Sequence, residues 1–339
     1  MNKTALITGV TGQDGSYLSD LLISKGYKVI GLVRRTVTSN EEKYCNISHL
    51  LDNEKFILES GDVTDSSSIW RLIDKHKPNE IYNLAAQSHV GESYLSPVST
   101  SEIDGLGPLH ILEAIRNMDK SIKFYQASTS EMFGDIPGPQ NELTSFSPVS
   151  PYACAKVFAH NMTATYRKSY DMYSCSGILF NHESPRRGEN FVTRKITKAA
   201  ARIKLGKQEI LELGNIDTHR DWGFAGDYVE AMWLMLQQDK PQDYVISTGE
   251  THTVREFVNL VFDIAGLDIN TQMRINPAFF RPHDVQHLLG DSTKARNQLG
   301  WSPKVDLKQL ANMMYERDLN LEKRGIKWLK IEVCLLKIL

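Results

Sequence analysis

The sequence is poor in cysteine, and its few cysteines are widely spread. Cys45, Cys154, Cys175 and Cys334 show neither C-x-x-C spacing nor the spacing of metal ligands. This argues against a structural zinc site and against a small fold held together by disulfides. We therefore expect reduced thiols in a cytoplasmic protein without a bound metal.

The sequence also lacks an excess of either charge and any long apolar run. Lys and Arg number 39 against 41 Asp and Glu, so no overall field favours nucleic acid or an anionic membrane as a partner. No apolar stretch reaches the about 20 residues of a transmembrane helix, and the chain begins on a strand pattern, so we expect no signal peptide. There is no internal repeat. With 339 residues the chain can bury a large core in one or two domains.

A glycine-rich turn between a strand and a helix is the first functional motif. Residues 3–8 have the pattern of a short buried strand, Gly9, Gly12 and Gly15 follow, and a helical pattern leads to a second strand at residues 27–33. This order within about 30 residues is typical of a dinucleotide-binding unit. The glycines permit a tight turn and let backbone N–H groups approach a pyrophosphate at the helix N-terminus. The alternative is a tight turn that binds no ligand.

The end of the second strand indicates which dinucleotide is bound. Enzymes that use NAD usually have an acidic residue there for the ribose 2′-hydroxyl. This chain has Arg34 and Arg35, and two guanidinium groups suit a 2′-phosphate. The pair favours NADP, although it could also be a solvated basic pair in a loop.

Strand patterns alternate with helical patterns, which predicts an α/β fold. We expect a Rossmann-type doubly wound parallel sheet with a smaller C-terminal α/β domain for the substrate. The NADP-binding domain should comprise residues 1–180 and about 215–250, and the substrate domain about 181–214 and 251–325. Helices are expected near residues 100–118, 192–205, 226–237, 253–265 and 307–323. Residues 326–339 form an apolar tail that the sequence leaves without explanation.

Polar and small side chains follow several predicted strands at the point where each strand ends. These segments are residues 85–90 after the strand at 80–84, residues 128–131 after 123–127, and residues 181–188 after 173–180. Because ligands bind at the carboxyl edge of open parallel sheets, we expect these segments to surround a site. Asp62, after the strand at 56–59, could bind an adenine amino group or cap the next helix.

A tyrosine and a lysine one helical turn apart supply the second functional motif. Tyr152 and Lys156 follow Pro151, which suits the first turn of a helix, so their side chains share one face. A phenol has an unperturbed pKa near 10, and an ammonium one turn away favours the phenolate. The pair suggests a proton acceptor beside a nicotinamide, although a Tyr–Lys pair on a helix surface is a common alternative.

Three cations lie in uncommon surroundings in the second half of the chain. Lys195 follows the polar segment at 181–188, Arg220 stands in H-R-D-W, and Arg281 stands in F-R-P-H-D. Composition alone would make them ordinary surface charges. Their neighbours suggest positioned cations instead.

Seven stretches together resemble the extended short-chain dehydrogenase/reductases and, within them, the GDP-mannose 4,6-dehydratase family. They are residues 5–15 (ALITGVTGQDG), 83–90 (NLAAQSHV), 126–131 (QASTSE), 150–156 (SPYACAK), 179–195 (LFNHESPRRGENFVTRK), 220–228 (RDWGFAGDY) and 289–291. The first and fourth are shared by the whole superfamily, whereas the fifth and sixth are more specific to the dehydratases. The resemblance covers the chain to about residue 320.

The resemblance implies a role for individual residues. The active site would consist of Thr129, Glu131, Tyr152 and Lys156. NADP would be held by Gly9, Thr11, Gly12, Gln13, Asp14, Gly15, Arg34, Arg35, Asp62, Val63, Leu84, Ala85, Ala86, Gln87, Ser88, Lys156, His182 and Arg187. GDP-mannose would contact Ser88, Asn181, Lys195, Arg220, Arg281 and Asp284, with the cations on its diphosphate.

The implied reaction converts GDP-α-D-mannose to GDP-4-dehydro-6-deoxy-D-mannose and water, an early step towards deoxysugars such as fucose or rhamnose. Tyr152 would take the O4 proton and Glu131 the C5 proton. A nucleotide-sugar 4-epimerase or 4-reductase would keep Tyr152 and Lys156 without needing Glu131, and a non-catalytic NADP-binding sensor could lose either of the former two. Whether the protein also reduces its own product stays open.

The chain departs from the family pattern at several positions. Ser99 stands where the family usually has Tyr, Val149 where it has Arg, and Asp284 where it has Glu. The loop at residues 36–46 differs from the version that reaches a neighbouring subunit's cofactor. The resemblance therefore implies a homodimer or homotetramer, with the tetramer less supported.

Overall fold

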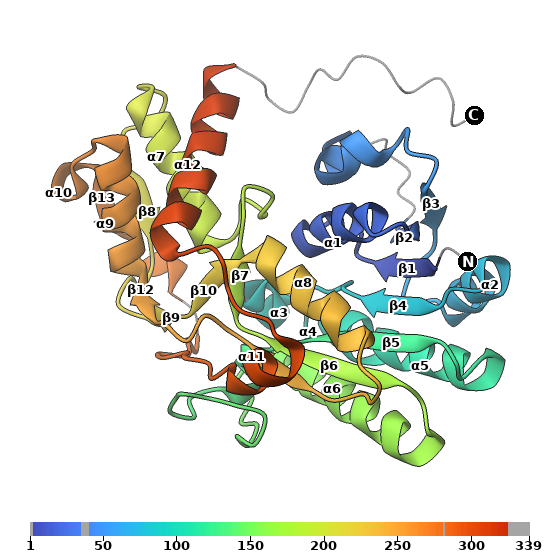
Figure 1. The fold of residues 1–339 in the computed structure, drawn as a ribbon. Helices are drawn as coiled ribbons and strands as arrows, with labels where there is room; N and C mark the ends of the chain where they lie inside the picture. The colour runs from blue at the N-terminus through green and yellow to red at the C-terminus, as the bar shows by residue number, and fades with distance from the viewer. Residues whose placement is uncertain (1–2, 35–40, 281, 325–339) are drawn as a thin grey trace.

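The computed structural model describes residues 3–34, 41–280 and 282–324. Its centre is a seven-stranded sheet in the order β11-β6-β5-β4-β1-β2-β3, in which every neighbouring pair is parallel (Figure 1). The strands are β1 (Thr4–Thr8), β2 (Lys28–Val33), β3 (Phe56–Ser60), β4 (Glu80–Asn83), β5 (Lys123–Thr129), β6 (Ser174–Leu179) and β11 (Tyr244–Ile246). The predicted α/β class and doubly wound sheet are confirmed. The order reverses between β1 and β4, where open sheets bind their ligands.

Helices cover both faces of the sheet because successive strand residues point to opposite sides. The helices on one face are α1 (Gln13–Ser24), α8 (Ala225–Leu236) and α11 (Thr293–Leu299), and those on the other are α2 (Ser66–His76), α5 (Gly107–Met118) and α6 (Pro151–Tyr170). Ala5 and Ile7 of β1 pack in the first core, and Leu6 between them packs in the second. A strand that is buried on both faces consists of consecutive apolar residues. This is why the strands could be identified from the sequence.

A second group of elements packs beside the sheet at its carboxyl edge (Figure 1). Its helices are α7 (Val192–Lys204), α9 (Val254–Ala265), α10 (Ile269–Gln272) and α12 (Leu307–Lys323), and its strand pairs are β7 (Asn181–Glu183) with β10 (Trp222–Phe224), β8 (Leu211–Leu213) with β13 (Met273–Ile275), and β9 (His219–Arg220) with β12 (His252–Thr253). The buried side chains of α7, α9 and α12 form their own core. The division of the chain into two domains stays a prediction.

The helix expected at residues 100–118 is interrupted. It divides into α4 (Pro97–Ser101), a π turn η2 (Glu102–Leu106) and α5. Pro108 explains the interruption, because a proline ring clashes with the carbonyl four residues earlier and offers no N–H to it. That carbonyl belongs to Asp104, so the helix widens there instead of continuing regularly.

Short elements complete the chain. They are η1 (Glu41–Leu50), α3 (Val90–Leu95), η3 (Ser130–Phe133) and η4 (Pro277–Phe279). In the part of the chain that the structure describes, no helix has the length and apolar character needed to cross a membrane. The apolar tail at 326–339 lies outside the described residues.

Candidate active site

One cleft of about 1360 Å³ runs along the carboxyl edge of the sheet and brings the predicted site residues together. Its walls come from the ends of β1, β2, β4, β5 and β6, from the start of α6, and from the second group of elements. Every predicted site residue within the described ranges lines it. Arg35 and Arg281 lie outside those ranges.

The glycine turn at the start of α1 forms one end of the cleft. Gly9 has φ of +67°, and a Cβ there would come within 2.8 Å of the backbone of Leu84 and Ala85. A Cβ on Gly15 would come within 2.4 Å of the Gly9 carbonyl oxygen. Gly9 and Gly15 thus have no room for side chains in the turn that leads into α1, where the chain from β4 passes, and this shape fits a dinucleotide pyrophosphate.

Gln13 and Asp14 carry side chains that already bind protein groups. Asp14 pairs with His182 at 2.8 Å between Oδ2 and Nε2, while the His182 Nδ1 atom lies 2.8 Å from the Phe180 carbonyl oxygen. Burial is the largest single influence on both groups and disfavours their charged forms. Their mutual attraction and the other hydrogen bonds together outweigh it, so the pKa of His182 is raised and that of Asp14 is lowered. Gln13 donates to the His182 carbonyl and accepts from Ser184. These bonds join the glycine turn to β7, a contact between distant segments that the sequence did not predict.

Tyr152 and Lys156 stand at the start of α6, as their spacing predicts. The Ser150 hydroxyl caps the helix by accepting from the Ala153 N–H at 3.1 Å, and Pro151 occupies the first turn. The Lys156 ammonium lies 5.7 Å from the centre of the Tyr152 ring and donates to the Ala127 carbonyl at 3.1 Å. Both side chains are buried.

The protonation of Tyr152 differs from the sequence-based expectation. Burial raises the pKa of Tyr152, and the negative charge of Asp104 raises it further, while a hydrogen bond with Thr129 works in the other direction. Burial is the largest of these influences, and it favours the neutral phenol. A phenolate at this position needs further positive charge in the cleft.

Thr129 and Glu131 lie opposite this helix, where β5 passes into the single turn η3. The Thr129 hydroxyl accepts from the Glu131 N–H at 3.2 Å, which fixes the start of the turn. Both residues are 9 % exposed, so the carboxylate borders the cleft without being solvated on all sides. Tyr152, Lys156, Thr129 and Glu131 thus converge from two elements.

The far end of the cleft carries Lys195 and Arg220, two of the cations that the family resemblance implies for the diphosphate. Lys195, on α7, lies 3.8 Å above the ring of Phe279. Arg220, on β9, donates to Asp284 at 2.9 Å and to the carbonyl oxygens of His219 and Val285. Asp284, the shorter replacement for the family's Glu, is thus an ion-pair partner of Arg220.

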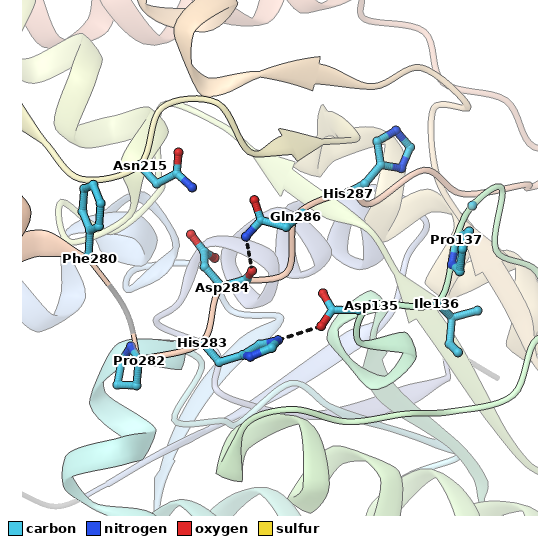
Figure 2. A pocket seen from close by; sticks show the side chains of 11 residues that line it. Asp135, Ile136, Pro137, Asn215, Phe280, Pro282, His283, Asp284, Gln286 and His287 are labelled. Atoms are coloured by element: carbon cyan, nitrogen blue, oxygen red, sulfur yellow. Dashed lines mark hydrogen bonds and ion pairs between the residues drawn. The ribbon is translucent and has the colours of Figure 1, made fainter.

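A smaller pocket of about 720 Å³ adjoins this end of the cleft (Figure 2). Phe280 and Asp284 line both spaces. Across the pocket, His283 and Asp135 lie 2.7 Å apart, which connects the segment after residue 282 to the segment after η3.

Several residues of the cleft were not identified from the sequence. Lys43 lines the cleft near the end of β2, where its ammonium donates to the Arg34 carbonyl, and Phe279 and Phe280 are about half exposed within the cleft. Lys43 lies in η1, which carries no recognisable sequence motif. The adjacent aromatics preceding Arg281 were a signal that could have been used, because exposed aromatic pairs are uncommon outside binding sites.

Comparisons with known proteins agree with one another over most of the chain. A family model described as GDP-mannose 4,6 dehydratase matches residues 6–314. GDP-mannose 4,6 dehydratase 1 of Arabidopsis thaliana is 54 % identical, over 95 % of this chain and 91 % of its own. The GDP-mannose 4,6-dehydratase of Vibrio cholerae is 46 % identical, over 96 % of both chains.

Solved structures share the fold at lower identity. A UDP-glucose 4-epimerase from Thermotoga maritima superposes with a TM-score of 0.81 at 26 % identity, covering 95 % of this chain and 99 % of its own. A dTDP-glucose 4,6-dehydratase from Bacillus anthracis superposes with the same score at 21 % identity, covering 95 % and 97 %, a likeness in fold alone.

Proposed function

The chain belongs to the GDP-mannose 4,6-dehydratase family, and from this premise we propose that it converts GDP-α-D-mannose to GDP-4-dehydro-6-deoxy-D-mannose and water. It is then a hydro-lyase. The observation that carries the proposal is the single cleft in which a bare glycine turn, the Tyr152–Lys156 pair and the Glu131 carboxylate all meet. A 4-epimerase has the first two features but no use for the third.

We assign the first proton transfer to Tyr152. Its phenolate would accept the proton of the mannose O4 hydroxyl. Thr129, which is hydrogen-bonded to Tyr152, would orient the O4 hydroxyl. A nicotinamide dinucleotide in the cleft would supply the chemistry that accepts a hydride from C4 and returns one to C6. Gly9, Gly12 and Gly15 would hold its pyrophosphate, since they leave the N-terminus of α1 open.

We assign the elimination to Glu131. Once C4 is a ketone, the C5 proton is acidic enough for a carboxylate to remove. Glu131 would then deliver a proton to the C6 hydroxyl, which departs as water. When the hydride returns to C6, C5 takes up one proton, which replaces the proton that Tyr152 removed from O4. Tyr152 and Glu131 therefore end the reaction in the protonation states in which they began it.

We propose NADP as the cofactor, on the strength of the cations at the end of β2. Arg34 and Lys43 both line the cleft there, and neither is an acid that would bind a ribose 2′-hydroxyl. Burial lowers the pKa of Lys43, and the positive charge of Arg34 lowers it further. The two cations together suit a 2′-phosphate.

Replacing both Arg34 and Arg35 by alanine should weaken NADP binding about tenfold or more and leave NAD binding nearly unchanged, because a charge-assisted hydrogen bond contributes about 1.5–3 kcal/mol. Titration of each dinucleotide by calorimetry measures the ratio. Lys28→Ala, which removes an exposed cation at the opposite end of β2, serves as the control. An unchanged NADP/NAD ratio in the double variant would make this assignment wrong.

We further propose that the protein is at least a homodimer. Leu95, Val98, Leu106 and Phe158 are 81 %, 71 %, 44 % and 41 % exposed, and they lie on α3, α4, η2 and α6, which pack on one another. Large apolar side chains gathered in this way indicate a surface that is covered by a second copy.

Incubation of the purified protein with GDP-mannose and no added reductant tests the function. We expect a nucleotide sugar lighter by one water, because the redox steps balance within one turnover. Light scattering on the same sample should give at least twice the monomer mass. A product of unchanged mass would indicate an epimerase instead, and the monomer mass would refute the proposed pairing.

A further inference from the structure

A buried ion pair joins α7 to α12. The Arg194 Nε and Nη2 atoms each lie 2.7 Å from the Asp318 Oδ1 atom, and the Thr197 hydroxyl donates to the Asp318 Oδ2 atom at 2.7 Å. Arg194 and Asp318 are 2 % and 1 % exposed, and neither lines the cleft. Because apolar side chains of similar volume often stabilise an interior as well as a buried ion pair does, the pair calls for an explanation other than packing.

The remaining arm of the Arg194 guanidinium binds the loop that follows β7. Its Nη1 atom donates to the carbonyl oxygens of Pro185 and Arg187, at 3.0 and 2.9 Å. Residues 184–191 form neither helix nor strand, so these carbonyls have no partner in a regular backbone ladder. A guanidinium is planar, so its two contacts with Asp318 fix the direction in which the third arm points.

The same loop places Arg187 at the cleft. The Arg187 guanidinium carbon lies 3.6 Å from the centre of the Phe191 ring, its Nε atom lies 3.2 Å from the Glu183 carboxylate, and the residue lines the cleft. The preceding Arg186 pairs with Asp20 of α1 at 2.8 Å. The loop therefore connects the helix after the glycine turn to the second group of elements, and the ion pair of α7 and α12 holds it from the second side.

We propose that Asp318 is a positioning residue for the cofactor site, because it directs the Arg194 guanidinium at the loop and thereby sets the place of the Arg187 guanidinium. Asp318 acts only through Arg194 and two backbone carbonyls. A guanidinium at the edge of the cleft suits an anionic group of a bound dinucleotide. The identity of that ligand rests on the proposed function, whereas the hold of α12 on the loop does not.

Hydrogen exchange of the ligand-free protein tests the hold on the loop. The Arg186 N–H donates to the Ser184 hydroxyl, and the Arg187 N–H donates to the Ser184 carbonyl. Asp318→Asn keeps the shape of the side chain but removes its charge, so these two amides should exchange about tenfold faster. Unchanged exchange of both amides in the folded variant would overturn the proposal.

Asp227→Asn is the matched control, because it also removes a buried carboxylate. The Asp227 Oδ2 atom accepts from the backbone N–H groups of Lys304 and Val305, and the residue does not line the cleft. The control should lower Tm and leave exchange at residues 186 and 187 unchanged. Equally fast exchange of these amides in both variants would mean that any loss of stability loosens the loop, and the proposal would be wrong.

Calorimetric titration with NADP tests the consequence for the ligand. We expect Arg187→Ala to weaken binding about tenfold and Asp318→Asn about threefold or more. The combined variant should bind no more weakly than Arg187→Ala alone, because Asp318 acts through that residue. Additive losses would contradict the proposal. If the wild type binds neither NADP nor NAD, the proposed cofactor is wrong, while the exchange experiment still shows whether Asp318 holds the loop, so the two failures are distinguishable.

A variant that replaces both charges separates positioning from packing, and it also serves if Asp318→Asn does not fold. Arg194→Met combined with Asp318→Leu keeps the interior filled and leaves no unpaired charge, so it should fold. The carbonyl oxygens of Pro185 and Arg187 lose their donor, so the loop amides should still exchange faster and NADP should still bind more weakly. Wild-type exchange and affinity in this variant would make the pair a packing element and overturn the proposal.

Discussion

Glu131→Gln should stop the reaction after the first half, with reduced cofactor accumulating on the enzyme and little product released. The amide keeps the shape of the side chain, and its backbone N–H still donates to Thr129. It cannot accept the C5 proton, so the ketone at C4 forms but water is not eliminated. We expect a loss of about 10²–10⁴-fold in kcat, the usual contribution of a positioned acid–base group.

Two measurements follow this variant. Nicotinamide absorbance after mixing with GDP-mannose should rise and persist in Glu131→Gln, whereas the wild type should show no lasting rise. In heavy water, the wild-type product should carry deuterium at C5. Glu142→Gln is a suitable control, because its carboxylate accepts from the Val245 N–H and does not line the cleft. Near-normal turnover with C5 deuterium intact would mean that the base lies elsewhere.

Tyr152→Phe should block the reaction one step earlier. Without the hydroxyl, no group accepts the O4 proton, so neither ketone nor reduced cofactor forms. We again expect kcat to fall by about 10²–10⁴-fold, with substrate affinity nearly unchanged because the ring still fills its buried position. Stopped-flow absorbance distinguishes this variant from Glu131→Gln, which should show the rise that Tyr152→Phe lacks.

The control for this variant lies on the same helix. Tyr170→Phe removes a hydroxyl at the last turn of α6, where the ring packs against Tyr166 away from the cleft, and it should leave kcat unchanged. Reduced cofactor formed by Tyr152→Phe at the normal rate would contradict the assignment of Tyr152 as the proton acceptor.

Much of the fold could be predicted because its signals are local. The strands of a sheet covered on both faces are short apolar runs. Gly9, Gly12 and Gly15 are recognisable as a dinucleotide-binding motif because a strand precedes them and a helix follows them. The four-residue spacing of Tyr152 and Lys156 fixes a shared helical face whatever the rest of the chain does. The ends of the strands and the Arg34–Arg35 pair could also be assigned to the site from local patterns, but the individual roles of most other residues depended on the family resemblance.

Other features of the site escaped prediction because they depend on segments far apart in the sequence. Lys43 reaches the cleft only through the path of η1, and Phe279 lies below Lys195 only because β13 pairs with β8. The helix at 100–118 was expected to be regular, since the effect of Pro108 on the turn before it depends on whether neighbouring elements can accept the extra residue.

The sequence by itself determined which elements form and which residues lie at their carboxyl ends, because backbone geometry and the periods of helix and strand act over a few residues. Only the tertiary structure decided which of these ends meet and how their charges interact. Burial raises the pKa of Tyr152, and the π turn η2 packs on α6 so that Gly105 lies against the backbone of Ala155. Burial and charge pairing depend on every segment that surrounds a group, and no single stretch of sequence contains that information.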